Sequence, residues 1–197
     1  MSLTLTEEIM MATADSATDG AARLRNLMAA RATAAEAWEL FDGLPTVRVD
    51  EITTGRWRGD EVGTGHPWDG LLVETGWYGK QFDSADSVQP LLFTGPDNEI
   101  FAVDPRRVPL FLAGKVPVRA LRPVRGALGA LRPLLRTRTP RARLRELEFR
   151  GKSSAAMIYD HLPIIDVFRR VDADTLLGVM DMRGLNEPYF FVLYRDR

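Results

Sequence analysis

The chain has 197 residues, of which 45% are hydrophobic and 27% charged, and its formal net charge is −1. This length suits one well-buried core and is short for two, while the near-zero charge argues against a general nucleic-acid binder, which needs a basic surplus for phosphate contacts. The sequence contains no cysteine and two histidines, which excludes disulfides, thiolate metal sites and cysteine nucleophiles. A metal site of carboxylates with one histidine is left open but has no spacing signature, so we expect neither a metal nor a cofactor.

Residues 1–31 are rich in Ala, Thr and Met, and this composition predicts a flexible N-terminal extension. The first residues lack the basic and apolar regions of a secretory signal. No apolar run approaches the ~18–20 residues of a membrane helix. We expect a cytoplasmic protein whose remaining residues, 32–197, form one domain.

A short amphipathic helix is predicted to begin that domain. Thr33 and Glu36 have the spacing of a capping box. Gly43 and Pro45 then stop the helix. Its apolar face has helical spacing and consists of Ala34, Ala37, Trp38 and Phe41. We expect this helix to lie across the opening of the domain or against its wall.

From residue 46 onward the pattern favours many short strands separated by turns, with a short helix between residues 68 and 76. Such strands predict an antiparallel barrel or sandwich rather than βαβ units. The expected strands are 47–61, 77–82, 88–94, 99–104, 143–150, 153–160, 174–183 and 188–195.

Residues 105–142 interrupt the strands with six prolines, which preclude a long regular element. Leucines at three- and four-residue spacing and many arginines predict a broken, basic, amphipathic helical insert. Three interpretations are open: a solvated pair of portal helices, a segment that docks on anionic lipid, or a contact for a protein or nucleic acid. The lack of aromatic residues between 119 and 143 argues against base stacking and hence against nucleic acid.

Residues 55–59 read Gly-Arg-Trp-Arg-Gly, a GXWXG motif, and several other motifs follow it in order. These are His66-Pro67, Trp77-Tyr78-Gly79-Lys80-Gln81-Phe82, Asp104-Pro105, Phe149-Arg150-Gly151, Met157-Ile158-Tyr159-Asp160, Pro163-Ile164-Ile165-Asp166 and Gly178-Val179-Met180-Asp181. Together they resemble the bacterial GXWXG family with its C-terminal partner domain of unknown function. The resemblance covers about residues 38–197 in three parts, 38–104, the insert 105–142, and 143–197, and implies no catalytic residues.

A glycine and Trp57 on the first strand after a short helix are also similar to the lipocalin and fatty-acid-binding (calycin) pattern. This resemblance implies a mainly β, antiparallel calycin-like β-barrel. In such barrels the tryptophan plugs one end and an arginine of the last strand stacks across it. Arg195 is the matching residue here, so Trp57 and Arg195 are expected to be structural. The Arg-rich insert departs from the minimal pattern.

Two segments carry the candidate site residues. Strict alternation on residues 77–80 places Tyr78 and Lys80 on one face. If this face points inward, the two side chains can grip an anionic head group. If it points outward, Lys80 is a solvated charge.

The second segment, residues 159–166, is densely polar. Tyr159, Asp160 and His161 suit acid–base chemistry, and Asp166 suits an ion pair with Lys80 or an arginine. The alternative is a turn in which Asp166 caps a short helix.

His66, in the loop 63–67, is either a ligand contact at the barrel mouth or a loop anchor. These residues favour an intracellular carrier of a hydrophobic small molecule, such as a fatty acid or phospholipid. The ligand-binding candidates are Tyr78, Lys80, Tyr159, His66 and Asp160.

Two other functions are open. One is an enzyme, a cyclase, isomerase or hydrolase, that uses Asp160, Asp166 or His66 in the same cavity. The other is an interaction module with a filled barrel. The sequence lacks a nucleophile elbow, a phosphate loop and a zinc motif, which favours binding over catalysis.

Overall fold

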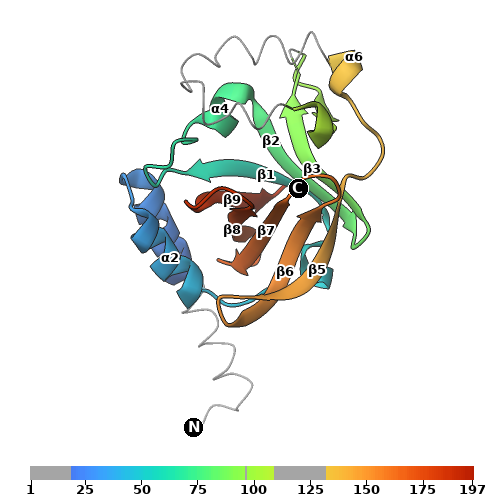
Figure 1. The fold of residues 1–197 in the computed structure, drawn as a ribbon. Helices are drawn as coiled ribbons and strands as arrows, with labels where there is room; N and C mark the ends of the chain where they lie inside the picture. The colour runs from blue at the N-terminus through green and yellow to red at the C-terminus, as the bar shows by residue number, and fades with distance from the viewer. Residues whose placement is uncertain (1–18, 96, 109–131) are drawn as a thin grey trace.

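The computed structural model describes residues 19–95, 97–108 and 132–197 (Figure 1). Antiparallel strands are the main regular elements. Their bounds are Gly55–Val62 (β1), Trp77–Ser84 (β2), Ser87–Thr94 (β3), Ile100–Ala102 (β4), Ala142–Phe149 (β5), Lys152–Tyr159 (β6), Ile164–Arg170 (β7), Thr175–Met182 (β8) and Tyr189–Arg195 (β9).

The helices are short. Residues 19–29 are helical, and further helices are α2 (Ala34–Gly43), α3 (Val49–Ile52), α4 (Leu71–Thr75), the 3₁₀ helix η1 (Pro105–Arg107) and α6 (Arg132–Leu135). The capping box of α2 is confirmed, because the backbone N–H of Thr33 donates to Oε2 of Glu36 at 2.7 Å and that of Glu36 donates back to Oγ1 of Thr33 at 3.2 Å. The helix expected between residues 68 and 76 is confirmed as α4.

The strands form one antiparallel sheet whose pairings close into a ring. Their order is β2-β1-β9-β8-β7-β6-β5-β3-β4, and β2 also pairs with β3. Every strand except β4 therefore belongs to the ring. The junction between β3 and β5 is the shortest, a single pair between Val88 and Ala142. The predicted mainly β, antiparallel class is confirmed.

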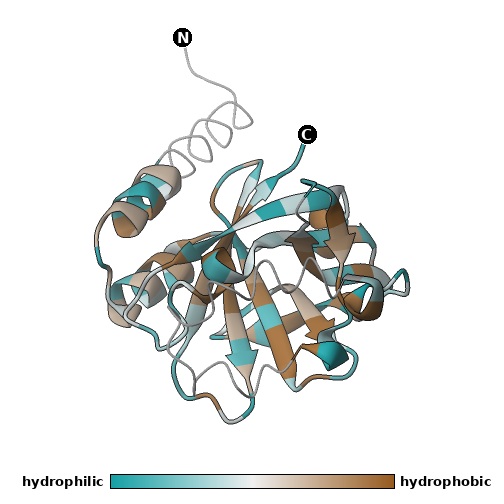
Figure 2. Cartoon of the chain, turned by 90° about the horizontal axis from the view of Figure 1, so that it is seen from above, coloured by the Kyte–Doolittle hydropathy of each residue, from teal (hydrophilic) through white to brown (hydrophobic). Residues whose placement is uncertain are grey.

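Alternate side chains of the strands enter two hydrophobic clusters. Phe190 of β9 packs in a cluster with Leu40 and Phe41 of α2, which lies beside the ring in Figure 1. Phe191 instead joins Leu144 of β5, from the opposite side of the ring, in the cluster that fills the interior. Several strands are hydrophobic along much of their length, as the brown stretches in Figure 2 show. Because successive side chains of a strand point to opposite faces, both faces of a strand such as β9 are buried.

One end of the ring is closed by the residues that the calycin resemblance singled out. Trp57 is fully buried, and its indole N–H donates to the carbonyl of Ile52 at 3.1 Å. The guanidinium of Arg195 lies 4.5 Å from the centre of the Trp57 ring and donates to Oδ1 of Asp174 at 2.9 Å. A cation over an indole face stabilises by ~0.5–2 kcal/mol. The predicted pairing of Trp57 with Arg195 is confirmed.

The strand expected over 47–61 is wrong in its first half. Val49–Ile52 forms α3, and β1 begins at Gly55. The backbone N–H of Arg48 donates to Oε2 of Glu51 at 2.6 Å, which caps the helix. Val49 and Ile52 are three residues apart, a spacing that fits a helical turn better than a strand.

The short helix expected after Asp166 is also wrong. Residues Ile164–Arg170 form β7, which pairs with β6 and along its whole length with β8. The segment is rich in branched and aromatic residues, which suit a strand between two neighbours. Pro163 ends the preceding turn but does not prevent a strand from starting after it.

Two predicted segments lie largely outside the described residues. Of the extension 1–31, residues 19–29 form a helix, and Leu24 on this helix is 3% exposed. Of the Arg-rich insert 105–142, the structure describes its two ends, η1 and α6. Within the described ranges, no helix is long and apolar enough to cross a membrane.

Candidate functional site

A small cavity lies within the ring, with a volume of about 60 Å³. Strands β2, β3 and β6 to β9 contribute its wall, together with Trp68, Leu71 and Leu72 from the segment at α4. Most of the lining side chains are apolar or aromatic. The exceptions are Lys80 and Asp166, which makes this cavity chemically distinct.

Two larger hollows have a different character. One, of about 350 Å³, lies between the helix 19–29 and α2, and the other, of about 210 Å³, lies at the Trp57 end of the ring. The second is bordered by Arg195 and Arg170, whose guanidinium groups are held by Asp174 and Glu51 respectively. These two arginines of the second hollow serve structural pairs, whereas the small cavity combines an apolar wall with a buried charged pair, so it is the better candidate site.

Lys80 and Asp166 form a buried ion pair. The Nζ atom of Lys80 lies 2.7 Å from Oδ2 of Asp166, and the two side chains are 4% and 3% exposed. Lys80 also donates to the carbonyl of Pro90 at 3.3 Å. Burial raises the pKa of Asp166, while the nearby charge and hydrogen bond of Lys80 act in the opposite direction. Of the alternatives that the sequence left open for Asp166, the structure therefore has the ion pair with Lys80.

Aromatic rings surround the ammonium group of this pair. Nζ of Lys80 lies 5.0 Å from the ring centre of Phe191, 5.6 Å from that of Trp77 and 5.7 Å from that of Tyr159. These distances fall within the range of cation–π attraction. Burial, followed by the charge of Asp166, raises the pKa of Tyr159 well above its usual value, so its phenol stays protonated.

The motif glycine Gly59 leaves the space that the Trp77 ring occupies. A Cβ atom at Gly59 would lie 2.0 Å from Cζ3 of Trp77, far inside van der Waals contact. The GXWXG motif therefore has two packing roles: Trp57 closes one end of the ring, and Gly59 admits the tryptophan of the next strand. The indole N–H of Trp77 is buried and has no hydrogen-bond partner in the part of the chain that the structure describes.

An irregularity at Gly79 brings Trp77 and Lys80 to the same cavity. The register between β2 and β3 shifts on both sides of Gly79, and such a bulge changes the side to which the following residues point. Gly79 has φ of 149°, and a Cβ atom there would lie 1.9 Å from the carbonyl oxygen of Trp57. This position therefore requires glycine.

Tyr78 does not share a face with Lys80, so that part of the sequence prediction is wrong. Its hydroxyl donates to Oδ2 of Asp196 at 2.7 Å, and the side chain is absent from the cavity wall. The bulge at Gly79 separates the two residues, which strict alternation places together.

His66 and Asp160 also lie away from the cavity wall. His66 is 6% exposed; its Nδ1 accepts the backbone N–H of Trp68 at 3.0 Å, and its ring centre lies 5.1 Å from that of Tyr189. Burial is the main cause that lowers the pKa of His66. This environment fits the loop-anchor interpretation. Asp160 is exposed and pairs with Arg143 at 3.3 Å.

Sequence reasoning missed Glu61 and Tyr189, which join α4 to the ring of strands. Oε1 of Glu61 accepts the hydroxyl of Tyr189 and the backbone N–H of Leu72 at 3.0 Å. Burial raises the pKa of Glu61. Alternation from Trp57 places Glu61 on the inner face of β1, and this signal was available in the sequence.

Two family models match the chain, one described as GXWXG protein over residues 39–98 and one described as Domain of unknown function (DUF4334) over residues 140–195. The chain belongs to the GXWXG family. The resemblance drawn from the motifs is thereby confirmed. Lys80 lies in the GXWXG segment and Asp166 in the DUF4334 segment, so the buried ion pair joins the two matched parts of the family.

Among solved structures, the chain is similar to a crystal structure of a protein from Thermomonospora curvata. The two are 36% identical, the match covers 91% of this chain and 99% of that chain, and the TM-score is 0.66. No curated protein matches the chain. The likeness covers nearly the whole length of both chains.

Proposed function

We propose that the ring of strands is a calycin-like barrel and that its cavity binds a small hydrophobic molecule beside the Lys80–Asp166 pair. The barrel assignment is supported by the closed pairing of the strands and by Arg195 stacked on Trp57. The binding role is carried by one observation, a fully buried ion pair that lines an otherwise apolar cavity.

Stability alone gives a weak reason for this pair. Replacing a buried ion pair by well-packed apolar residues is often neutral or stabilising. Ligand sites, by contrast, are typically apolar hollows with a few placed polar groups that fix orientation. The aromatic rings around Lys80 supply the apolar surface, and the pair supplies the polar group.

The volume limits the ligand. Drug-sized ligands occupy pockets of about 300–1,000 Å³, whereas this cavity measures about 60 Å³. A short molecule therefore fits best. Binding a fatty acid or a phospholipid requires the wall at Trp68 and α4 to move, so a lipid-like ligand stays a prediction. Docking of the Arg-rich insert on an anionic membrane also stays a prediction.

Native mass spectrometry of the purified protein, followed by denaturing extraction, tests the proposal. We expect a stoichiometric apolar molecule of low mass that leaves on denaturation. A filled barrel that acts as an interaction module predicts a bare protein mass, and that mass, together with no binding in a screen of small apolar compounds, would refute the proposal.

The second candidate function is an enzyme that transfers protons, and the burial of Asp166 in the cavity favours it. Catalytic acids and bases are found in cavities with shifted pKa values, and the raised pKa of Asp166 beside Tyr159 meets this criterion. Asp160 and His66 are less suitable because neither lines the cavity. Conversion of the extracted molecule by the wild-type protein, abolished in Asp166→Asn with binding retained, would support catalysis.

A further inference from the structure

We infer that the cavity selects a molecule whose polar group is a neutral hydrogen-bond acceptor, such as a carbonyl oxygen, and rejects carboxylates. This inference rests on the proposed function and names its ligand class. Two independent observations carry it: the charge balance of the cavity and the kind of polar atom that its wall leaves unpaired.

The charge of Lys80 is already balanced. Asp166 lies 2.7 Å from its ammonium group, and among the described residues the other side chains that line the cavity carry no charge. A carboxylate ligand would therefore enter as an unmatched negative charge beside Asp166. Like charges held together at a desolvated site cost several kcal/mol, so we expect carboxylates to bind at least about 100-fold more weakly than neutral isosteres.

The unpaired polar groups of the wall point to an acceptor on the ligand. Within residues 19–95, 97–108 and 132–197, the buried indole N–H of Trp77 has no partner, and indole nitrogen only donates. Lys80 has three N–H groups and bonds to Asp166 and Pro90, which leaves one. Among the described residues, the hydroxyl of Tyr159 makes no hydrogen bond.

Buried donors without a partner are rare and call for an explanation. In this inference, an acceptor oxygen of the bound molecule is the hydrogen-bond partner of the Trp77 N–H and of the remaining N–H of Lys80. Tyr189, the other phenol of the wall, is already engaged by Glu61, so it does not compete for the ligand.

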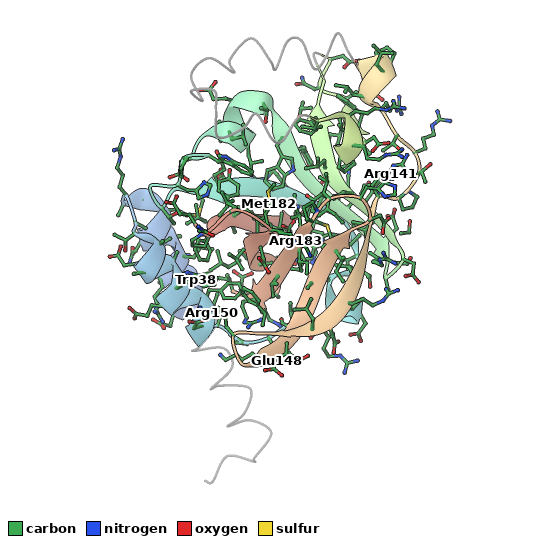
Figure 3. The ribbon with its side chains drawn as sticks, viewed as in Figure 1. Trp38, Arg141, Glu148, Arg150, Met182 and Arg183 are labelled. Carbon is green, nitrogen blue, oxygen red and sulfur yellow. The ribbon has the colours of Figure 1, made fainter. Side chains whose placement is uncertain are left out.

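The test compares three probes of the same shape and number of non-hydrogen atoms at pH 8: butanone, propanoate and 2-methyl-1-butene. Indole ¹H–¹⁵N spectra report on the tryptophans, of which the chain has four. Trp77→Phe identifies the Trp77 signal and removes the donor while it keeps an aromatic ring. Trp38→Phe is the control for a tryptophan change elsewhere, because Trp38 lies on α2 (Figure 3) and is not among the side chains that line the cavity.

We expect butanone to shift the Trp77 signal strongly and to bind at least about 100-fold more tightly than propanoate. Trp77→Phe should weaken butanone about tenfold, as loss of one net hydrogen bond does, and leave 2-methyl-1-butene unchanged. Trp38→Phe should change neither by more than about twofold.

Equal binding of propanoate and butanone overturns the inference and leaves the proposed function standing. An unmoved Trp77 signal with butanone bound also overturns it, and this readout on the wild-type protein does not depend on whether Trp77→Phe folds. If none of the three probes shifts an indole signal, the proposed function fails as well.

Discussion

Lys80→Met removes one half of the buried ion pair and leaves the carboxylate of Asp166 without its counter-ion. Methionine has a similar length and flexibility, so the aromatic surroundings keep most of their packing. The change isolates the charge, because Nζ of Lys80 bonds to Asp166 and to the carbonyl of Pro90. We expect this variant to be strongly destabilised.

The magnitude follows from burial. With side chains 4% and 3% exposed, solvent screens the pair little, and loss of one partner of such a pair costs about 3–5 kcal/mol. The double variant Lys80→Met with Asp166→Leu removes both charges, so we expect its free energy of unfolding to fall within about 1 kcal/mol of the wild type. A single variant much less stable than the double variant would therefore indicate an unpaired charge in a buried site.

Urea unfolding at several pH values measures both effects. Without Lys80, burial holds the pKa of Asp166 above its unfolded value, so the folded state keeps its proton over a wider range and stability falls as pH rises. The deficit of Lys80→Met should therefore be larger at pH 8 than at pH 5. A deficit below about 1 kcal/mol at pH 8, or one that does not depend on pH, would show that the pair is not desolvated.

Two further predictions concern packing and acid stability. Gly59→Ala drives a methyl group into the Trp77 ring and should cost about 1–3 kcal/mol. Gly43→Ala, whose Cβ would lie 3.6 Å from a guanidinium nitrogen of Arg23, should change stability by less than about 0.5 kcal/mol, and equal effects in urea unfolding would contradict the assigned role of Gly59. The hydrogen bond from Arg106 and the charge of Arg141 lower the pKa of Asp104 from 3.8 to about 2, so Asp104→Asn should cost roughly 2 kcal/mol at neutral pH. Because the folded pKa is the lower one, this contribution should vanish as pH falls from 3.8 through about 2, and a loss that persists below this window would contradict the assignment.

Local chemistry and family resemblance predicted the parts of the fold that depend on few residues. The capping bonds between Thr33 and Glu36 are local, and the stacking of Arg195 on Trp57 follows from the calycin likeness. The mainly β class follows from the number of short alternating segments. These features need no knowledge of how distant strands are paired.

The site depends on details that a local pattern does not contain. Alternation assigns Tyr78 to the face of Lys80, but the bulge at Gly79 reverses the assignment, and its cause is the close approach of the Trp57 backbone in the neighbouring strand. Asp166 resembles a helix cap next to a proline, and pairing on both sides of β7 overrides that preference. The sequence therefore offered the ion pair as one option among several.

The most direct test of the account compares the wild type with the Lys80→Met, Asp166→Leu double variant by native mass spectrometry. The account predicts that the wild type carries a small apolar molecule and that the double variant, although folded, carries it in much lower amount. Equal occupancy in both proteins would contradict the role of the ion pair in binding.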